Sequence, residues 1–429
     1  MLSSEVMKLS PRVTLTCVNT DKFKTGCISV NLITPLSEGD ASKNALLPRV
    51  LRRGTGLHPD MESLSEALDE LYGARIEPLV RKKGELQCVG FFADFVDDDF
   101  LPAGENILER VFTLLGEILL APRTHGGLLL AEYVDGERQN LIDDIRAAVN
   151  NKRAYAVDAL VRRMCADEAF GVHRLGSEDA AGAITARNLT PHYQKLIAAS
   201  RVEVFYCGMA SPKRVELAAR EALAPLLGNI KSAEPTTDVR LAPPTGEARR
   251  FTESLDVSQG KLSIGFRLGQ TMLAPNYAAL AVFNAAFGGA VTSKLFLNVR
   301  ERLSLCYYAS STIEKHKGLL VVSSGVEFAS FDRALEEILA QLDAIRAGDV
   351  SDWEFLSAKR AVVTSRCAAL DEPRGLEDAY FDQRLAKIPY RPDEFAALAE
   401  AVTKDEIIAA ANSAILDSIY FLTGTEVSA

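Results

Sequence analysis

The feature that most constrains the fold is an internal repeat. Residues 184–208 read ITARNLTPHYQKLIAASRVEVFYCG, and residues 402–424 read VTKDEIIAAANSAILDSIYFLTG. Each segment begins with an apolar residue and a threonine, continues with helical periodicity and ends as a short apolar strand that finishes at glycine. Thr185 and Thr403 are suitable helix N-caps, and Glu406 completes a capping box with Thr403. The repeat predicts a chain made of two similar halves.

The stretch between the two copies has the composition of a linker. Residues 228–249 contain Pro235, Pro243 and Pro244 among polar residues. The chain has 429 residues, of which 48% are hydrophobic, enough for two sizeable cores. We therefore predict an N-terminal domain over residues 1–227, a linker over 228–249 and a C-terminal domain over 250–429.

Both halves show strand signals first and long amphipathic helices afterwards. The apolar, β-branched runs that indicate strands are residues 13–20, 27–34, 85–95, 262–268, 305–312 and 319–326. Helical periodicity covers residues 62–72, 276–287, 331–347 and 353–369. This order predicts an α+β fold in which helices cover one face of a mostly antiparallel sheet in each half.

Composition excludes several classes of function. The net charge of -10 argues against a nucleic-acid partner and against an anionic membrane surface. No apolar signal-peptide core occurs in residues 1–12, and the seven scattered cysteines are typical of reduced thiols, so we expect a cytoplasmic protein. The uncharged stretch 270–293 is interrupted by Pro275 and by Gly288-Gly289, which favours a buried helix followed by a turn over a membrane span.

The sequence lacks the usual zinc motifs. No H-x-x-E-H segment is present, and the two histidines nearest in sequence, His173 and His192, are too far apart to share a helix face. The cysteines form no C-x-x-C pair, so we expect no metal and no cofactor. A G-x-S-x-G elbow is also missing, which leaves a serine or cysteine triad assembled in space as the remaining catalytic option.

Two segments carry a resemblance to a known family. Leu51-Arg-Arg-Gly-Thr55 resembles the end of the H-F-L-E-H-x-x-F-K-G-T segment of the M16 metallopeptidases, the pitrilysin and insulinase family, and residues 287–308 resemble a G-G-x-x-S-R-L-F-x-x-x-R-E-x-x-x-L-x-Y segment of the same family. The resemblance implies two homologous M16-like halves. Counting back from Thr55 puts Ala45 and Arg49 at the two zinc histidines and Pro48 at the general-base glutamate. It therefore implies a member without a zinc site.

The resemblance also identifies acidic positions downstream. Glu137 matches a supporting glutamate, and Asp144, two helical turns further along the chain, stands at the position of the third zinc ligand. The alternative interpretation is a solvated acidic helix face. Since a proline inside a helix costs about 3 kcal/mol, we predict that the helix containing Pro48 either starts near that residue or is kinked.

In the second half, Arg300 and Tyr307 match an arginine and a tyrosine that reach the active site from the half opposite the zinc. Both side chains can donate hydrogen bonds to a substrate carbonyl and to the oxyanion that forms from it. The alternative is a surface arginine beside Glu301 and an ordinary strand tyrosine. We interpret Gly288 and Gly289 as a helix C-cap and turn, because no phosphate-loop pattern surrounds them.

These observations lead to two hypotheses. The first is a non-catalytic subunit of a cytoplasmic M16-like zinc peptidase, inactive alone, that supplies Arg300 and Tyr307 to the active site of a zinc-bearing partner in a heterodimer. The second is a non-enzymatic scaffold or peptide-binding protein. Under both hypotheses we expect the chain to bind peptides, and under neither do we expect it to bind nucleic acid or a membrane.

Overall fold

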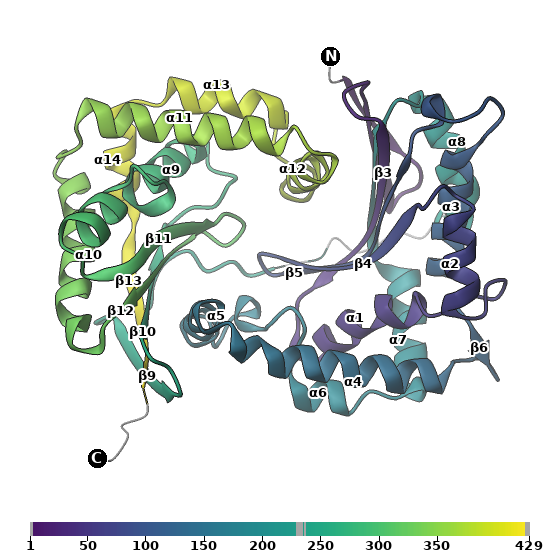
Figure 1. The fold of residues 1–429 in the computed structure, drawn as a ribbon, viewed down its shortest axis with the longest axis horizontal. Helices are drawn as coiled ribbons and strands as arrows, with labels where there is room; N and C mark the ends of the chain where they lie inside the picture. Colours follow the sequence, from purple (N-terminus) through teal and green to yellow (C-terminus); the bar gives the residue numbers. More distant parts are fainter. Residues whose placement is uncertain (1–2, 229–234, 236, 425–429) are drawn as a thin grey trace. The chain divides into compact units, whose positions relative to one another are not determined.

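The computed structural model describes residues 3–228, 235 and 237–424 (Figure 1). By packing, the chain forms two units. Unit 1 comprises Met1–Arg146, Val172–Thr237 and Glu372–Arg384, and unit 2 comprises Ala147–Gly171, Asp238–Asp371 and Leu385–Ala429. Each unit thus contains a segment from the other half of the sequence.

The predicted linker contains one of the points at which the chain passes from unit 1 to unit 2, between Thr237 and Asp238. Residues 229–234 and 236 of this linker lie outside the described residues. The division into domains 1–227 and 250–429 stays a prediction.

Unit 1 is built on a six-stranded sheet. Its strands, in spatial order, are β1 (Ser3–Lys8), β2 (Val13–Asn19), β8 (Arg201–Gly208), β3 (Thr25–Pro35), β5 (Leu86–Val96) and β4 (Arg75–Lys83). All neighbouring pairs are antiparallel except β2 and β8, which are parallel. A two-stranded ribbon of β6 (Thr124–His125) and β7 (Leu128–Leu129) lies outside this sheet.

Helices of unit 1 cover one face of this sheet. They are α1 (Glu38–Leu51), α2 (Met61–Asp69), α3 (Ile107–Leu120), α4 (Ala131–Ala147), α6 (Glu178–Gly182), α7 (Ala186–Ala199) and α8 (Pro212–Ala222). Because side chains alternate along a strand, Val204 and Tyr206 of β8 point into the core with these helices. The helical turns Asp98–Phe100 and Ala224–Leu226 complete the unit.

The opposite face of this sheet packs against α12 (Pro373–Ala386), which comes from the second half of the sequence. Phe205, which alternates with the core residues of β8, contacts Tyr380 with ring centroids 6.0 Å apart. Ser29 of β3 donates a hydrogen bond of 2.6 Å to Glu377. Lys83 of the edge strand β4 lies 3.0 Å from Asp382. The contacts of α12 with the sheet are therefore both aromatic and ionic.

Unit 2 repeats the same strand order without an equivalent of β1. Its five strands are β11 (Cys306–Glu314), β12 (Leu319–Val326), β10 (Gly260–Arg267), β13 (Ile415–Gly424) and β9 (Arg249–Leu255). Strand β13 pairs parallel with β9 and antiparallel with β10, as β8 does with β2 and β3. The two copies of the internal repeat therefore end as the equivalent strands β8 and β13.

The repeat is also matched in its helices. Thr185 caps α7 and Thr403 caps α14 (Lys404–Ser413), each in a capping box with the residue three positions later. The other helices of unit 2 are α9 (Tyr277–Asn284), α10 (Phe331–Arg346), α11 (Asp352–Ala369) and α13 (Phe395–Ala401). Two segments, Ala285–Gly289 and Leu295–Arg302, are π-helical. Short helical turns lie at Ala148–Asn150, Ala169–Gly171, Phe328–Ser330 and Pro392–Glu394. The predicted α+β fold of two similar halves is confirmed.

The second face of the unit 2 sheet packs against α5 (Lys152–Met164), a helix from the first half of the sequence. Leu160 packs with Val321 and Tyr420 in a separate apolar cluster. At Gly265 of β10, an added Cβ would lie 2.5 Å from the sulfur of Met164, so this position needs glycine for the close approach of α5.

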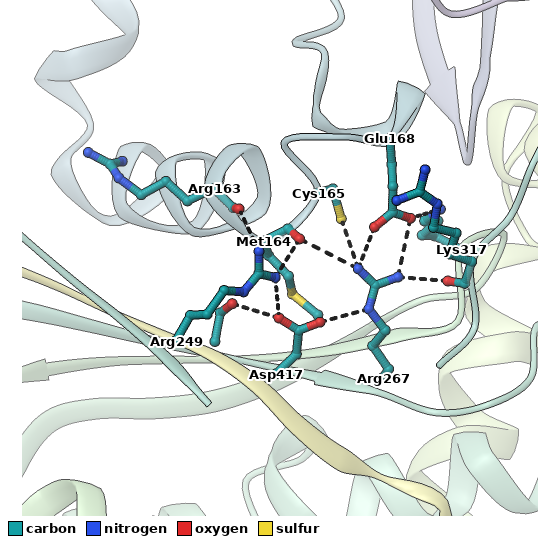
Figure 2. A network of polar contacts seen from close by, with 10 residues as sticks. Arg163, Met164, Cys165, Glu168, Arg249, Arg267, Lys317 and Asp417 are labelled. Atoms are coloured by element: carbon teal, nitrogen blue, oxygen red, sulfur yellow. Dashed lines mark hydrogen bonds and ion pairs between the residues drawn. The ribbon is translucent and has the colours of Figure 1, made fainter. Parts of the chain in front are cut away.

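A buried group of charges attaches the end of α5 to the same sheet (Figure 2). Arg267 and Lys317 both form ion pairs with Glu168, which follows α5. The Nε of Arg267 donates to Asp417 over 2.8 Å, and Arg249 donates to the carbonyl of Met164 over 2.8 Å and also pairs with Asp417. Each of the two carboxylates is thus shared by two cations.

The uncharged stretch 270–293 contains α9, most of whose residues are buried in the core of unit 2. In the part of the chain that the structure describes, no helix has the length and apolar character needed to cross a membrane.

Candidate functional site

Helix α1 contains the three positions that the resemblance assigns to the zinc site. Ala45 and Pro48 are buried in unit 1, and Arg49 is partly exposed. Alanine and proline have no metal-binding side chain, and the arginine guanidinium stays protonated and only donates hydrogen bonds. These three positions therefore offer no zinc ligand.

Pro48 lies inside α1, because the helix begins at Glu38 and ends at Leu51. The prediction that the helix starts near Pro48 is wrong. Ser37 has extended backbone at the N-cap, and the acidic residues Glu38 and Asp40 in the first turn favour a helix that starts there. Most of the residues of α1 are buried, which offsets the hydrogen bond that Pro48 cannot donate. A kink at Pro48 stays a prediction.

Two ion pairs join α1, and the turn that follows it, to α4. Arg49 lies 2.7 Å from Asp144, and Arg53 lies 3.4 Å from Glu137. The two acids are seven residues apart in α4 and share one helix face, whereas Arg53 lies in the turn after α1. Glu137 has a side chain only 12% exposed, which does not fit a simple solvated acidic face.

Arg49, Glu137 and Asp144 are residues that the sequence pattern predicts as site positions, whereas Arg53 is not. The spacing of four from Arg49 was a usable signal, because Arg53 lies inside the L-R-R-G-T segment. The structure brings Arg49 of α1 and Asp144 of α4 together, and it does so through an ion pair.

A cavity of about 560 Å³ lies beside these ion pairs, lined in part by Arg49, Arg53, Glu137 and Asp144. Among residues 3–228, 235 and 237–424, no group of three or more His, Cys, Asp or Glu side chains is arranged to hold a metal ion. The arrangement can bind charged groups through hydrogen bonds, and it has no means of activating a water molecule by metal coordination.

Two of the buried cysteines, Cys17 and Cys88, offer little nucleophilic character. Burial raises the pKa of Cys17 and of Cys88 to about 12 in each case, so both thiols stay protonated at neutral pH. Cys367 is exposed, whereas Cys27 and the others are buried. A serine or cysteine triad therefore gains no support from Cys17 or Cys88.

Arg300 lies near the end of the π-helical segment Leu295–Arg302 in unit 2. Its guanidinium stacks over the ring of Phe296 at 4.7 Å from the centroid, and its Nε is 3.6 Å from the carboxylate of Glu301. The side chain is 40% exposed. A guanidinium held over an aromatic ring keeps its charge while its direction is restricted.

Tyr307 follows on the first strand after this segment. The register of β11 against β12 shifts between Cys306 and Tyr308, so Tyr307 is the extra residue of a bulge. Its side chain is exposed, and its hydroxyl donates to the carboxylate of Glu327. This hydrogen bond raises the pKa of Tyr307 and keeps the phenol protonated. Glu327 was missed by the sequence analysis, since only strand pairing brings it close.

Arg300 and Tyr307 form no hydrogen bond with each other in the described part of the chain. Between them, Ser304 adopts a positive φ of 49°. A π-helical segment, a left-handed residue and a bulge thus follow one another within a short stretch, and such irregular backbone is frequent at functional sites.

Gly288 and Gly289 end the π-helical segment Ala285–Gly289. An added Cβ at Gly288 would lie 2.6 Å from the hydroxyl of Ser311, and one at Gly289 would lie 2.6 Å from the amide of Asn284. Close packing against β11 and against the preceding turn accounts for both glycines.

Comparisons with known proteins agree with this geometry. A family model described as the peptidase M16 inactive domain matches residues 183–362. A crystal structure of a conserved protein from Enterococcus faecalis V583 superposes with a TM-score of 0.90 at 29% identity, covering 99% of this chain and 100% of that one. The crystal structure of a peptidase M16 inactive domain from Pseudomonas fluorescens covers 99% of both chains with a TM-score of 0.79 at 17% identity, which supports the fold alone.

A curated relative covers nearly the whole chain. The Bacillus subtilis (strain 168) protein named probable inactive metalloprotease YmfF is 35% identical over 412 residues, which are 95% of this chain and 95% of that protein. Identity at this level over this length, together with the matching family model and fold, means that the chain belongs to the peptidase M16 family.

Proposed function

We propose that this chain is a non-catalytic subunit of a cytoplasmic M16-like zinc peptidase and that it acts in a heterodimer with a zinc-bearing partner. The observation that carries the proposal is the ion pair between Arg49 and Asp144 at two former ligand positions. A peptidase of this type needs zinc to generate its water nucleophile, so the nucleophile must come from another subunit. The name of the Bacillus relative, probable inactive metalloprotease, supports the absence of activity in the chain alone.

In this proposal the contribution of the chain to catalysis comes from unit 2. Arg300 is 40% exposed and Tyr307 is 53% exposed, so both side chains are accessible to a bound peptide. A guanidinium and a protonated phenol donate hydrogen bonds to a peptide carbonyl and to the oxyanion formed when the partner's zinc-bound water attacks it. The raised pKa of Tyr307 suits this role, because only the protonated phenol donates.

One observation favours a second function, a non-enzymatic scaffold or peptide-binding protein. The hydroxyl of Tyr307 already donates to Glu327, and Arg300 already lies near Glu301 and Phe296. In a purely structural role these contacts would be the whole purpose of the two side chains.

The experiment that separates the two functions measures peptide cleavage after the chain is mixed with a zinc-bearing M16 protein from the same organism. We expect no cleavage by either protein alone and cleavage by the mixture. Arg300→Ala and Tyr307→Phe should each reduce the rate constant of cleavage by about 100-fold, as loss of an oxyanion donor does, with complex formation unchanged.

Matched controls come from the same chain. Arg302→Ala removes an exposed arginine from the same helical segment, and Tyr72→Phe removes another exposed tyrosine hydroxyl that donates to a glutamate, Glu105. Both control variants should cleave like the wild type. If the mixture is inactive, or if Arg300→Ala and Tyr307→Phe behave like the controls, the scaffold or peptide-binding function is the better description.

A further inference from the structure

The cavity in unit 1 is unusually rich in arginine. Five arginine residues line it: Arg49, Arg52, Arg53, Arg174 and Arg374. Only three carboxylates accompany them, from Glu77, Glu137 and Asp144. The lining therefore has an excess of two positive charges, although the protein as a whole carries a net charge of -10.

Each of the three carboxylates has an arginine partner. Arg49 pairs with Asp144, Arg53 pairs with Glu137, and Arg374 lies 3.4 Å from Glu77. Within the described residues, Arg52 and Arg174 form no ion pair with a carboxylate. These two side chains carry the excess charge of the cavity.

Arg52 is fixed in position without being neutralised. Its Nε donates to the carbonyl of Ile76 over 2.8 Å, and its Nη1 lies 3.9 Å from the sulfur of Met61. Burial lowers the pKa of Arg52, because a partly desolvated cation without a counter-charge is less favourable than one in water. An anion bound beside Arg52 would restore the missing counter-charge.

Apart from Asn140, the rest of the wall is apolar. Pro78, Leu79 and Val80 come from the edge strand β4, and Leu175 is buried. An apolar wall around fixed guanidinium groups lowers the local dielectric and strengthens charge-assisted hydrogen bonds. Arginine forks match the planar geometry of carboxylate and phosphate oxygens.

We propose that the cavity beside these ion pairs is a binding site for an oxyanion, a carboxylate or a phosphate group, held by Arg52 and Arg174. The inference concerns unit 1 of the isolated chain and does not rest on the proposed partner subunit.

Isothermal titration calorimetry on the isolated chain, in chloride buffer of low ionic strength, tests this site. The probes are inorganic phosphate and a terminally blocked five-residue peptide with one central glutamate, with the glutamine version of that peptide as its neutral counterpart. We expect at least one of the two anionic probes to bind, and we expect its binding to weaken as salt is added. If the carboxylate is the ligand, the glutamine peptide should bind at least tenfold more weakly than the glutamate peptide. Binding of phosphate alone would assign the site to phosphate groups, and binding of the glutamate peptide alone would assign it to carboxylates.

Arg52→Gln and Arg174→Gln should each weaken the binding of whichever anionic probe binds the wild type by about tenfold or more, as loss of a charge-assisted hydrogen bond does. Arg360→Gln, which removes an exposed arginine of α11 in unit 2, should leave the affinity unchanged. Arg174 is exposed, so Arg174→Gln keeps the test valid even if Arg52→Gln does not fold. The proposal is overturned if neither anion binds, or if binding is the same in the wild type and in Arg174→Gln.

Discussion

Two groups of arginines and carboxylates, one in each unit, differ in how they are built. In unit 2, Arg267 and Glu168 have side chains only 2% and 4% exposed, and each carboxylate of the group is shared by two cations (Figure 2). In unit 1, Arg49 and Asp144 have side chains 22% and 56% exposed, and they lie at a cavity that contains more cations than anions.

The difference in burial separates a structural role from a binding role. Charges taken out of water are tolerated only when they are well matched and hydrogen-bonded, and they then attach one element to another. Charges that stay partly in water contribute little to stability. Cations in excess at such a place can therefore bind an anionic ligand. The group in unit 2 attaches the segment after α5 to the sheet, and the group in unit 1 is open to solvent.

The largest expected effect is that of Glu168→Gln. This change removes a buried carboxylate and leaves Arg267 and Lys317 without that counter-charge, so the free energy of unfolding should fall by about 3–5 kcal/mol. Urea unfolding followed by the fluorescence of Trp353, the single tryptophan, reports on unit 2. Asp158→Asn is the matched control, because Asp158 forms a more exposed pair with Arg162 on α5 and should cost less than about 1 kcal/mol. Equal losses in the two variants would contradict the structural role of the buried group.

The effect of Glu168→Gln should depend on pH. Burial alone would raise the pKa of Glu168, but hydrogen bonds from Arg267 and Lys317 outweigh it and lower the pKa below the ordinary value. A lowered pKa in the folded state means that the charge stabilises the protein above the unfolded pKa of about 4.3, and that this contribution is lost as pH falls through the folded pKa.

The difference in stability between the wild type and Glu168→Gln should therefore be constant near neutral pH and shrink below about pH 4.3. Urea midpoints measured at a series of pH values give this difference directly. A difference that grows on acidification would mean that Glu168 is not ionised in the folded protein.

The smallest expected effect is that of Asp144→Asn in unit 1. Asp144 is more than half exposed, so the loss of its ion pair with Arg49 should change the free energy of unfolding by less than about 1 kcal/mol. Urea unfolding followed by far-UV circular dichroism measures it. A loss as large as that of Glu168→Gln would remove the distinction between the two groups of charges.

Local patterns in the sequence were sufficient to predict much of the architecture. The N-caps Thr185 and Thr403, the capping box of Thr403 with Glu406 and the strand at Leu319–Val326 are formed as predicted, because caps and apolar, β-branched runs act over a few neighbouring positions. The start of α1 was not predicted, since the burial of the whole helix outweighs the local cost of Pro48.

The sequence by itself determined the two-fold repeat, the α+β class and the absence of the zinc motif, all of which depend on residue types at short spacing. Only the tertiary structure decided that α5 and α12 each pack on a sheet formed by strands from the other half of the sequence, and that Arg53 meets Glu137 and Arg267 meets Glu168, at sequence separations of 84 and 99 residues. Such pairs form because a buried or partly buried charge needs a partner in space, and any of many acids in the sequence could have been that partner. The excess of arginine in the cavity also depends on the tertiary structure, because the arginines that line it come from separate elements of the chain.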